Sequence, residues 1–299
     1  ITADLGFGVL DPFARRFPKQ FLNVGVAEQN MTGLATGLAL EGRIVFTYSL
    51  GNFPSLRCLE QIRNDACYHR ANVKVVTVGG GFSYGPVGAS HHATEDLSIL
   101  RALPSLAVLA PGDDWEAEQA VHALFSYPGT AYLRLERCGA PASPRPGEQF
   151  RIGRARTVRH GNDATLIACG GILAEAMQAA DSLAGLGVEC RVLSMHSLKP
   201  PDAGAVLRAA AETAGIVTVE ENTIDGGLGG CVAEILLEAG AAPGFFHRIG
   251  LQSCFSSEVG SQVHLRRFYG LDCSAIVSAI LARVTSFIPA AVRSYETTR

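Results

Sequence analysis

The sequence offers few of the features that assign a protein to a class at first sight. Its eight cysteines include no CxxC pair, and most lie in apolar runs. We therefore expect reduced core thiols in a cytoplasmic protein, rather than disulfides or a zinc site. No uninterrupted apolar run reaches the roughly 18 residues of a membrane span. The net charge is −3 and the Lys and Arg residues are scattered, which gives no electrostatic reason to expect a nucleic acid or a membrane as a partner.

What is present is a pattern of short β-rich runs that alternate with helical periodicity. Hydrophobic residues make up 47% and charged residues 18% of the 299-residue chain, which is typical of well-buried globular proteins and leaves room for two domains. The alternation predicts an α/β fold with two doubly wound domains and largely parallel sheets. The predicted strands span 44–47, 73–78, 106–109, 131–135, 165–169, 188–194, 216–220 and 245–249. The predicted helices span 56–68, 94–102, 113–125, 173–186, 202–211, 228–239, 259–268 and 273–284.

A stretch rich in proline and glycine, 137–148, separates the two series of elements. Each proline removes a backbone donor and restricts its neighbour, so the stretch is predicted to be extended. We therefore place a first domain at 1–143, a linker at 144–150 and a second domain at 151–299. The first domain opens inside its fold, and residues are expected to precede Ile1.

The motif Asn-Val-Gly-Val-Ala-Glu-Gln-Asn at 23–30 carries the strongest chemical signal. Glu28 falls at the start of an apolar, Gly/Ala-rich helical segment that extends to Leu40. A carboxylate in such surroundings is poorly solvated, which suits it to proton transfer. An ordinary helix-start glutamate, stabilised by the positive end of the helix dipole, fits the motif equally well.

Further motifs follow in order: Arg-Cys-Leu-Glu-Gln-Ile-Arg at 57–63, Ser-His-His-Ala-Thr-Glu-Asp at 90–96 and Gly-Gly-Leu-Gly-Gly at 226–230. Together with 23–30 they resemble the C-terminal half of transketolases over nearly the whole chain. The likeness is strongest to the smaller subunit of split, two-gene transketolase-like enzymes. The resemblance implies a thiamine diphosphate pyrimidine-binding domain followed by a transketolase C-terminal domain.

The resemblance implies thiamine diphosphate as the cofactor, which supplies carbanion chemistry that side chains cannot. Glu28 is expected to hydrogen-bond N1′ of the aminopyrimidine and so to promote removal of the thiazolium C2 proton. Phe53 is expected to stack on the pyrimidine ring, whereas without the family it would be an ordinary core residue. Leu50 falls where many relatives carry a second aromatic residue, so this side of the cofactor site is expected to be aliphatic.

Part of the family's cofactor site is missing from the sequence. Family members hold the diphosphate and Mg²⁺ (or Ca²⁺) with a Gly-Asp-Gly run and a downstream Asn on another domain, and no such arrangement is found here. A partner subunit with the diphosphate-binding domain is therefore expected to hold the metal, with no metal ligand in this chain. An α2β2 assembly is the expected form. The segment 56–68, with Arg57, Glu60 and Arg63, is a candidate interface; without the family it would be a solvated charged face.

The expected substrate-binding residues combine matches with departures. His91 aligns with a family histidine that contacts the oxygens of the donor and can exchange protons near pH 7, and His92 is a weaker candidate. Arg137 can bind a phosphate or carboxylate, or form an ion pair in the linker. Val87 falls where relatives place an aspartate that reads a donor hydroxyl, and Gly79 where transketolases often have a phosphate-contacting histidine.

We therefore expect a two-carbon ketol transfer between sugar or sugar phosphate substrates, with altered donor or acceptor preference, in carbohydrate or natural-product metabolism. The alternatives are the β subunit of a 2-oxo acid dehydrogenase, a deoxyxylulose phosphate synthase-like enzyme, and a non-catalytic scaffold that keeps only the fold. The departures from the family pattern keep the scaffold open. The joint presence of Glu28, Phe53 and His91 argues against it, although a fold alone never establishes activity.

Overall fold

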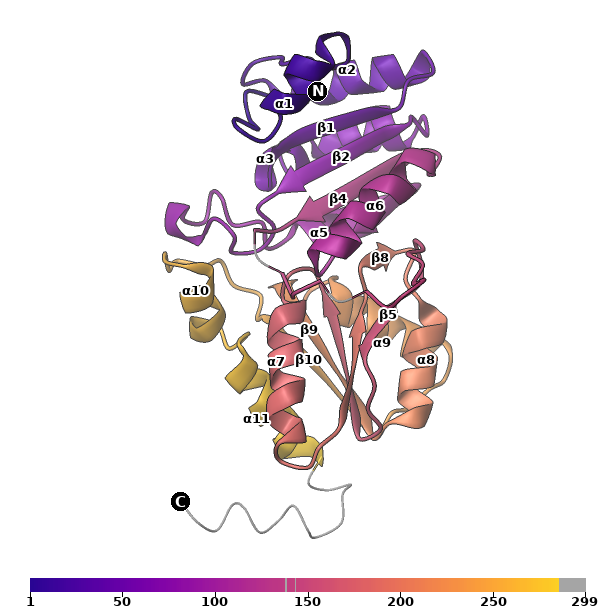
Figure 1. Cartoon of the computed structure of the whole chain (residues 1–299), viewed down its shortest axis with the longest axis vertical. Coiled ribbons are helices and arrows are strands. Elements are labelled where there is room, and N and C mark those ends of the chain that lie inside the picture. Colours follow the sequence, from indigo (N-terminus) through magenta and orange to yellow (C-terminus); the bar gives the residue numbers. More distant parts are fainter. Residues whose placement is uncertain (138, 143, 285–299) are drawn as a thin grey trace.

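The structure, a computed structural model, describes residues 1–284 with the exception of Cys138 and Ser143. Two five-stranded sheets follow one another along the long axis of the molecule (Figure 1). This arrangement confirms the predicted α/β fold with largely parallel sheets. Within the described part of the chain, no helix is long and apolar enough to cross a membrane.

The first sheet has the order β1-β2-β4-β3-β8. Its strands are β1 (Val45–Leu50), β2 (Val73–Val78), β3 (Leu106–Leu109), β4 (Thr130–Leu135) and β8 (Ser197–Lys199). The first four strands are parallel, and the predictions at 73–78 and 106–109 are confirmed residue for residue. The sequence did not predict β8. It comes from the second half of the chain and pairs antiparallel with β3, so the two halves share this sheet.

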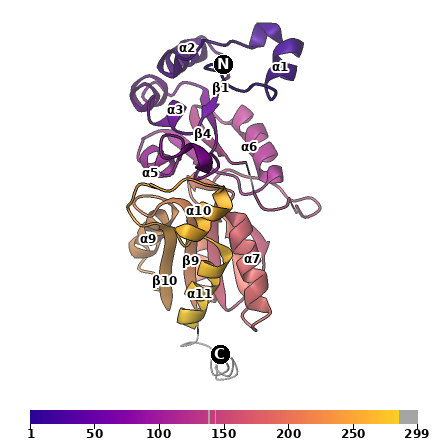
Figure 2. The ribbon, with the colours of Figure 1, turned by 90° about the vertical axis from the view of Figure 1, so that its left-hand side faces the viewer.

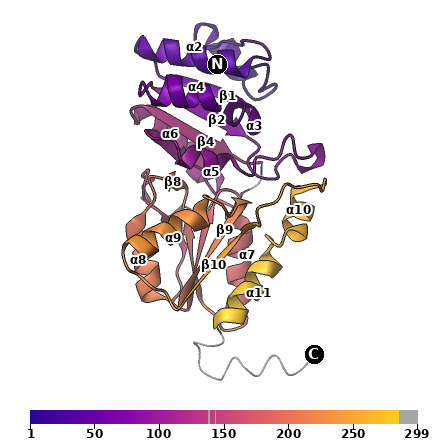
Figure 3. The same cartoon turned by 180° about the vertical axis from the view of Figure 1, so that it is seen from behind.

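Helices cover both faces of the first sheet (Figures 1 and 3). They include α2 (Glu28–Leu40), α5 (Asp96–Arg101) and α6 (Asp114–Ser126). A short helix, α1 (Asp11–Arg16), and a 3-10 turn (Pro18–Gln20) lie near the N-terminus and contain no buried residue. Alternate strand residues point to opposite faces: Val73 and Val75 pack with α2 and α5, whereas Val76 packs with α6. Asp113 caps α6, because its side chain accepts a hydrogen bond from the backbone N–H of Glu116 (2.7 Å).

The prediction of a single helix over 56–68 is wrong. This stretch forms two shorter pieces, α4 (Leu59–Gln61) and a π-helical segment (Ile62–Cys67), and a separate short helix, α3 (Asn52–Ser55), precedes it. In the π-helical segment the backbone N–H of Tyr68 donates to the carbonyl of Arg63, five residues earlier (3.1 Å). The wider turn allows Ile62, Ala66 and Cys67 to reach the core together. An apolar pattern of ordinary helical period does not distinguish this arrangement from a regular helix.

The second sheet has the order β10-β9-β6-β7-β5 and is parallel except for the edge strand β5. Its strands are β5 (Arg156–Arg159), β6 (Ala164–Cys169), β7 (Cys190–Ser194), β9 (Gly215–Thr223) and β10 (Phe245–Leu251). One face packs against α7 (Leu173–Ala184) and α11 (Cys273–Val284), the other against α8 (Ala203–Glu212) and α9 (Leu228–Glu238) (Figures 1 and 3). The sequence did not predict β5, and α10 (Gln262–Phe268) begins later than expected because Ser261 caps it.

The apolar core is continuous between the halves of the chain. A single cluster joins Leu97 and Leu100 of α5 to Val206 of α8 and Leu228 of α9. Buried free cysteines contribute to the cores, as the sequence predicted, at positions 58, 67, 169, 190 and 231. Burial raises the pKa of the Cys67 thiol to about 11, so this thiol stays protonated and unreactive near neutral pH.

Candidate active site

Glu28 is the first residue of α2 and lies at the edge of the core of the first sheet. Only 3% of the residue is exposed, so its carboxylate requires a compensating charge or hydrogen bonds. Arg57 provides both, because its Nη1 atom donates to Glu28 Oε2 at 2.8 Å. The Arg57 side chain is 48% exposed. The pair therefore connects a buried carboxylate to the surface of the first domain.

Phe53 and His91 extend this group of side chains. Phe53 lies in α3, just after β1 ends at the buried Leu50. The Arg57 guanidinium lies 4.8 Å from the centroid of the Phe53 ring. The His91 ring meets the same aromatic ring edge-on, with 5.3 Å between centroids. Glu28, Arg57, Phe53 and His91 thus contact one another in series, although they come from three separate segments of the chain.

A closed loop between β2 and α5 carries His91. Gly81 and Ala93 exchange backbone hydrogen bonds of 2.8 and 3.0 Å at its base. Outside this base, Ser90 Oγ lies 2.9 Å from His91 Nδ1. A hydrogen bond at Nδ1 orients the ring and leaves Nε2 for a ligand.

His92 points in a different direction from His91. It is 2% exposed, and its Nε2 lies 3.1 Å from the carbonyl oxygen of Gly85 on the opposite side of the loop. Its ring also packs edge-on against Phe82, with 5.1 Å between centroids. The structure therefore holds His92 inside the loop and does not bring it to the group formed by Glu28, Phe53 and His91.

The remaining predicted residues line the outer part of the loop region. Val87 lies in a 3-10 turn (Gly85–Val87) and is 52% exposed. Arg137 follows β4, is exposed, and lies with its guanidinium 5.7 Å from the centroid of the Tyr84 ring. Tyr84 in turn covers Gly79: a Cβ at position 79 would overlap Cδ2 and Cε2 of that ring.

Sequence reasoning did not single out Tyr84. Its ring takes the space in which a side chain at position 79 would start, so the glycine there and the tyrosine five residues later belong together. Burial, with a smaller contribution from Tyr84, raises the pKa of Tyr48. The signal available in the sequence was the glycine at position 79, where transketolases often have a histidine. This signal does not indicate which side chain fills the space.

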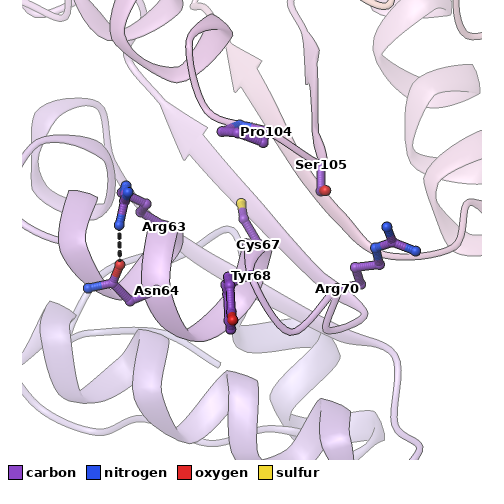
Figure 4. A pocket seen from close by; sticks show the side chains of 7 residues that line it. All are labelled: Arg63, Asn64, Cys67, Tyr68, Arg70, Pro104 and Ser105. Carbon is purple, nitrogen blue, oxygen red and sulfur yellow. Dashed lines mark hydrogen bonds between the residues drawn. The ribbon is translucent and has the colours of Figure 1, made fainter.

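A pocket of about 610 Å³ lies elsewhere on the first domain (Figure 4). Its lining residues are Arg63, Asn64, Cys67, Tyr68, Arg70, Pro104 and Ser105. These residues precede β2 and β3, whereas Phe53 and the His91 loop follow β1 and β2. Because β1, β2 and β3 are parallel, the pocket lies at the opposite end of the strands and contains none of the predicted site residues.

No group of three or more His, Cys, Asp or Glu side chains that could hold a metal ion occurs in the part of the chain that the structure describes. The ligands available near Glu28 are instead one carboxylate, one guanidinium, one aromatic ring and one imidazole. These groups can bind and orient a flat, polar heterocycle and exchange a proton with it.

Comparison with known proteins agrees with this geometry. Residues 1–141 match the family model of the transketolase pyrimidine binding domain, and residues 153–276 match that of the transketolase C-terminal domain. A 6-deoxy-6-sulfo-D-fructose transketolase subunit from Clostridium sp. (strain MSTE9) is 38% identical, over 89% of this chain and 82% of that protein. An apulose-4-phosphate transketolase subunit from Actinobacillus succinogenes is 33% identical, over 91% and 87% of the two chains.

Other relatives are longer. A 1-deoxy-D-xylulose-5-phosphate synthase from Pelotomaculum thermopropionicum is 36% identical over 95% of this chain, which spans 44% of that protein. Among solved structures, a split-gene transketolase described as an inactive β4 tetramer has a TM-score of 0.84 and 35% identity, and the match covers 95% of this chain and 91% of that one. The motifs, the fold and these matches agree, and the chain belongs to the transketolase family.

Proposed function

We propose that this chain is the pyrimidine-side subunit of a split, thiamine diphosphate-dependent transketolase-like enzyme. It would transfer a two-carbon ketol unit between sugar or sugar phosphate substrates, and only together with a partner subunit. The observation that carries the proposal is the series of contacts from the buried Glu28 through Arg57 and Phe53 to His91. A scaffold would have no need to keep a nearly buried carboxylate beside an aromatic ring and an imidazole.

The residues fit the pyrimidine end of the cofactor. Thiamine diphosphate supplies a stabilised carbanion when it is bound. Glu28 would share a proton with a ring nitrogen, because its carboxylate is shielded from water and the half-exposed Arg57 that donates to it can release it to a ligand. Phe53 would support the ring by stacking, and the aliphatic Leu50 would form the neighbouring wall. His91 Nε2 would donate to or accept from a substrate oxygen.

The diphosphate end requires another chain. The described residues hold no group of metal ligands, so Mg²⁺ or Ca²⁺ would be bound by a partner subunit with the diphosphate-binding domain. Two apolar side chains of the N-terminal part of the first domain, Phe7 and Val26, are 72% and 75% exposed, which suits a surface that a partner covers. Relatives named as transketolase subunits, and a β4 assembly described as inactive, support an α2β2 enzyme.

Substrate contacts would come from the loop between β2 and α5. His91 and Val87 would face the donor, with His92 held behind them by its bond to Gly85. The exposed guanidinium of Arg137 would bind a phosphate or another anion on the substrate. With valine at position 87, no carboxylate would accept a hydrogen bond from a donor hydroxyl at this point.

Calorimetric titration of thiamine diphosphate with Mg²⁺ tests the proposal. The cofactor would be titrated into this chain alone and into the chain reconstituted with the product of a neighbouring gene for a diphosphate-binding subunit. Binding in the reconstituted sample alone is the expected result. A demonstrated complex that binds no cofactor would reject the enzyme and favour the scaffold. Turnover of pyruvate, with no turnover of ketose donors, would favour the synthase-like or 2-oxo acid dehydrogenase alternatives, the first of which has relatives at 36% identity.

A further inference from the structure

The loop that carries His91 contacts the second domain of the chain as well as the first. In three views the loop and the segment that leads into α10 lie side by side (Figures 1, 2 and 3). The backbone N–H of Gly260 donates to the carbonyl of Gly85 (3.4 Å). From these contacts we propose that Glu221, in β9 of the second domain, is a positioning residue for the loop that carries His91. The proposal deepens the proposed function and rests on it for its effect on catalysis.

Glu221 binds the loop at its base. The residue is 1% exposed, and its Oε1 accepts a hydrogen bond of 2.5 Å from the backbone N–H of Phe82. The two residues are 139 positions apart. Gly81, next to Phe82, has a φ of +59°, and a Cβ there would overlap the Glu221 carboxylate. Glycine at position 81 therefore permits both the backbone conformation and the close approach.

Neighbouring groups of the second domain fix the orientation of this carboxylate. Gln262 Nε2 donates to the same Oε1 at 2.9 Å. Arg266 Nε donates to Oε2 at 2.5 Å. Glu221 is thus held on both oxygens by side chains of α10, and Oε1 still accepts from Phe82. Hydrogen bonds to a charged acceptor are the stronger ones, so this arrangement restrains the loop effectively.

The Phe82 side chain is held by the second domain too. It is fully buried and stacks on Tyr269, with 5.5 Å between ring centroids and 16° between ring planes. The Phe82 ring also packs edge-on against His92. Contacts from the second domain therefore reach the residue adjacent to His91 through one aromatic ring. We therefore expect release of Phe82 to loosen His92 and, through it, the position of His91 against Phe53.

Hydrogen–deuterium exchange of the reconstituted complex, with donor kinetics and cofactor titration, tests the proposal. In Glu221→Gln the amide nitrogen must replace one carboxylate oxygen. It then faces either Phe82 N–H together with Gln262 Nε2, or Arg266 Nε, so at least one hydrogen bond is lost. We expect exchange of the amides in 79–93 to become about tenfold faster. The kcat/KM for the donor should fall by about the same factor through kcat, with the affinity for thiamine diphosphate unchanged.

Glu220→Gln is the matched control. Glu220 is the adjacent buried carboxylate of β9, but its oxygens accept from the backbone N–H groups of Leu228 and Gly229 in α9, away from the loop. This variant should leave both loop exchange and donor kcat/KM within about twofold of the wild type. An unchanged exchange rate of 79–93 in Glu221→Gln, or an equal increase in Glu220→Gln, would overturn the positioning role.

A second variant reaches the same loop by another contact. Tyr269→Leu removes the ring stacked on Phe82 and leaves the Glu221 carboxylate in place, so it should also accelerate loop exchange and would carry the test if Glu221→Gln did not fold. Exchange is measured without turnover. A wild-type complex that is inactive, with a loop that Glu221→Gln still loosens, would reject the proposed function and leave the positioning role standing.

Discussion

Gly79 and Tyr84 provide a sharp test of how the loop region is built. Gly79 follows β2 with a φ of +101°, a conformation that side chains rarely adopt. The Tyr84 ring lies where a Cβ at position 79 would stand, at a separation under the 3.0 Å that real Cβ atoms keep. The replacement Gly79→Ala therefore carries two separate costs, one in the backbone and one at the Tyr84 ring.

Each cost can be estimated. The positive φ should destabilise an alanine by about 1–2 kcal/mol relative to glycine. Displacement of the Tyr84 ring should cost a further ~1 kcal/mol, because the ring loses its packing and its contact with the Arg137 guanidinium. We therefore expect Gly79→Ala to lower the free energy of unfolding by about 2–3 kcal/mol, and Tyr84→Ala alone by about 1 kcal/mol.

The two costs separate in a double-mutant cycle measured by urea unfolding. In the variant that carries both replacements the ring is absent, so only the backbone cost of Gly79→Ala remains beside that of Tyr84→Ala. The loss in free energy of unfolding in the double variant should thus be about 1 kcal/mol smaller than the sum of the losses in the two single variants. Additive effects, within about 0.5 kcal/mol, would show that Tyr84 does not constrain position 79.

Three further outcomes are expected. In the reconstituted enzyme, Glu28→Gln should lower kcat about 100-fold or more, and retention of most of the turnover would reject its role in proton transfer. Val87→Asp should change the preference between donors that differ in one hydroxyl configuration by about tenfold; an unchanged ratio of kcat/KM values would remove our account of this position. Burial raises the pKa of Glu220 from 4.5 to about 7. The folded chain therefore keeps a proton that the unfolded chain releases, so stability should fall as pH rises from 4.5 to 7, by on the order of 3 kcal/mol. Glu220→Gln should flatten that slope in urea titrations, and an unaltered slope would assign it to other groups.

The sequence predicted those parts of the fold that rest on local patterns. The strands at 73–78 and 106–109 are short runs of apolar or β-branched residues, with Lys74 as the one exception, and turn residues bound them, so their limits follow from composition. The π-helical segment Ile62–Cys67 and the edge strand β8 could not be predicted in this way. The first differs from a regular helix in its wider turn and its hydrogen bonds, which an apolar pattern does not reveal. The second depends on a partner strand far away in the chain.

The same difference between local patterns and long-range contacts holds for the candidate site. Short motifs located Glu28, Phe53 and His91, which the structure brings into one group, but they said nothing of the direction of each side chain. His92, adjacent to His91, turns into the loop. Glu221 had no recognisable motif, since its relevance comes from a contact with Phe82, 139 positions earlier.

The Glu28–Arg57 pair explains how this chain can fold with only its own part of the proposed cofactor site. A nearly buried carboxylate with no counter-charge would destabilise the fold, because desolvation of an ion is costly unless it is paired. Arg57 supplies the charge from within the chain, so Glu28 does not depend on a partner or cofactor to be tolerated. Arg57 is also half exposed and lies over Phe53. It can therefore release Glu28 to a ligand and still keep a favourable contact with the aromatic ring.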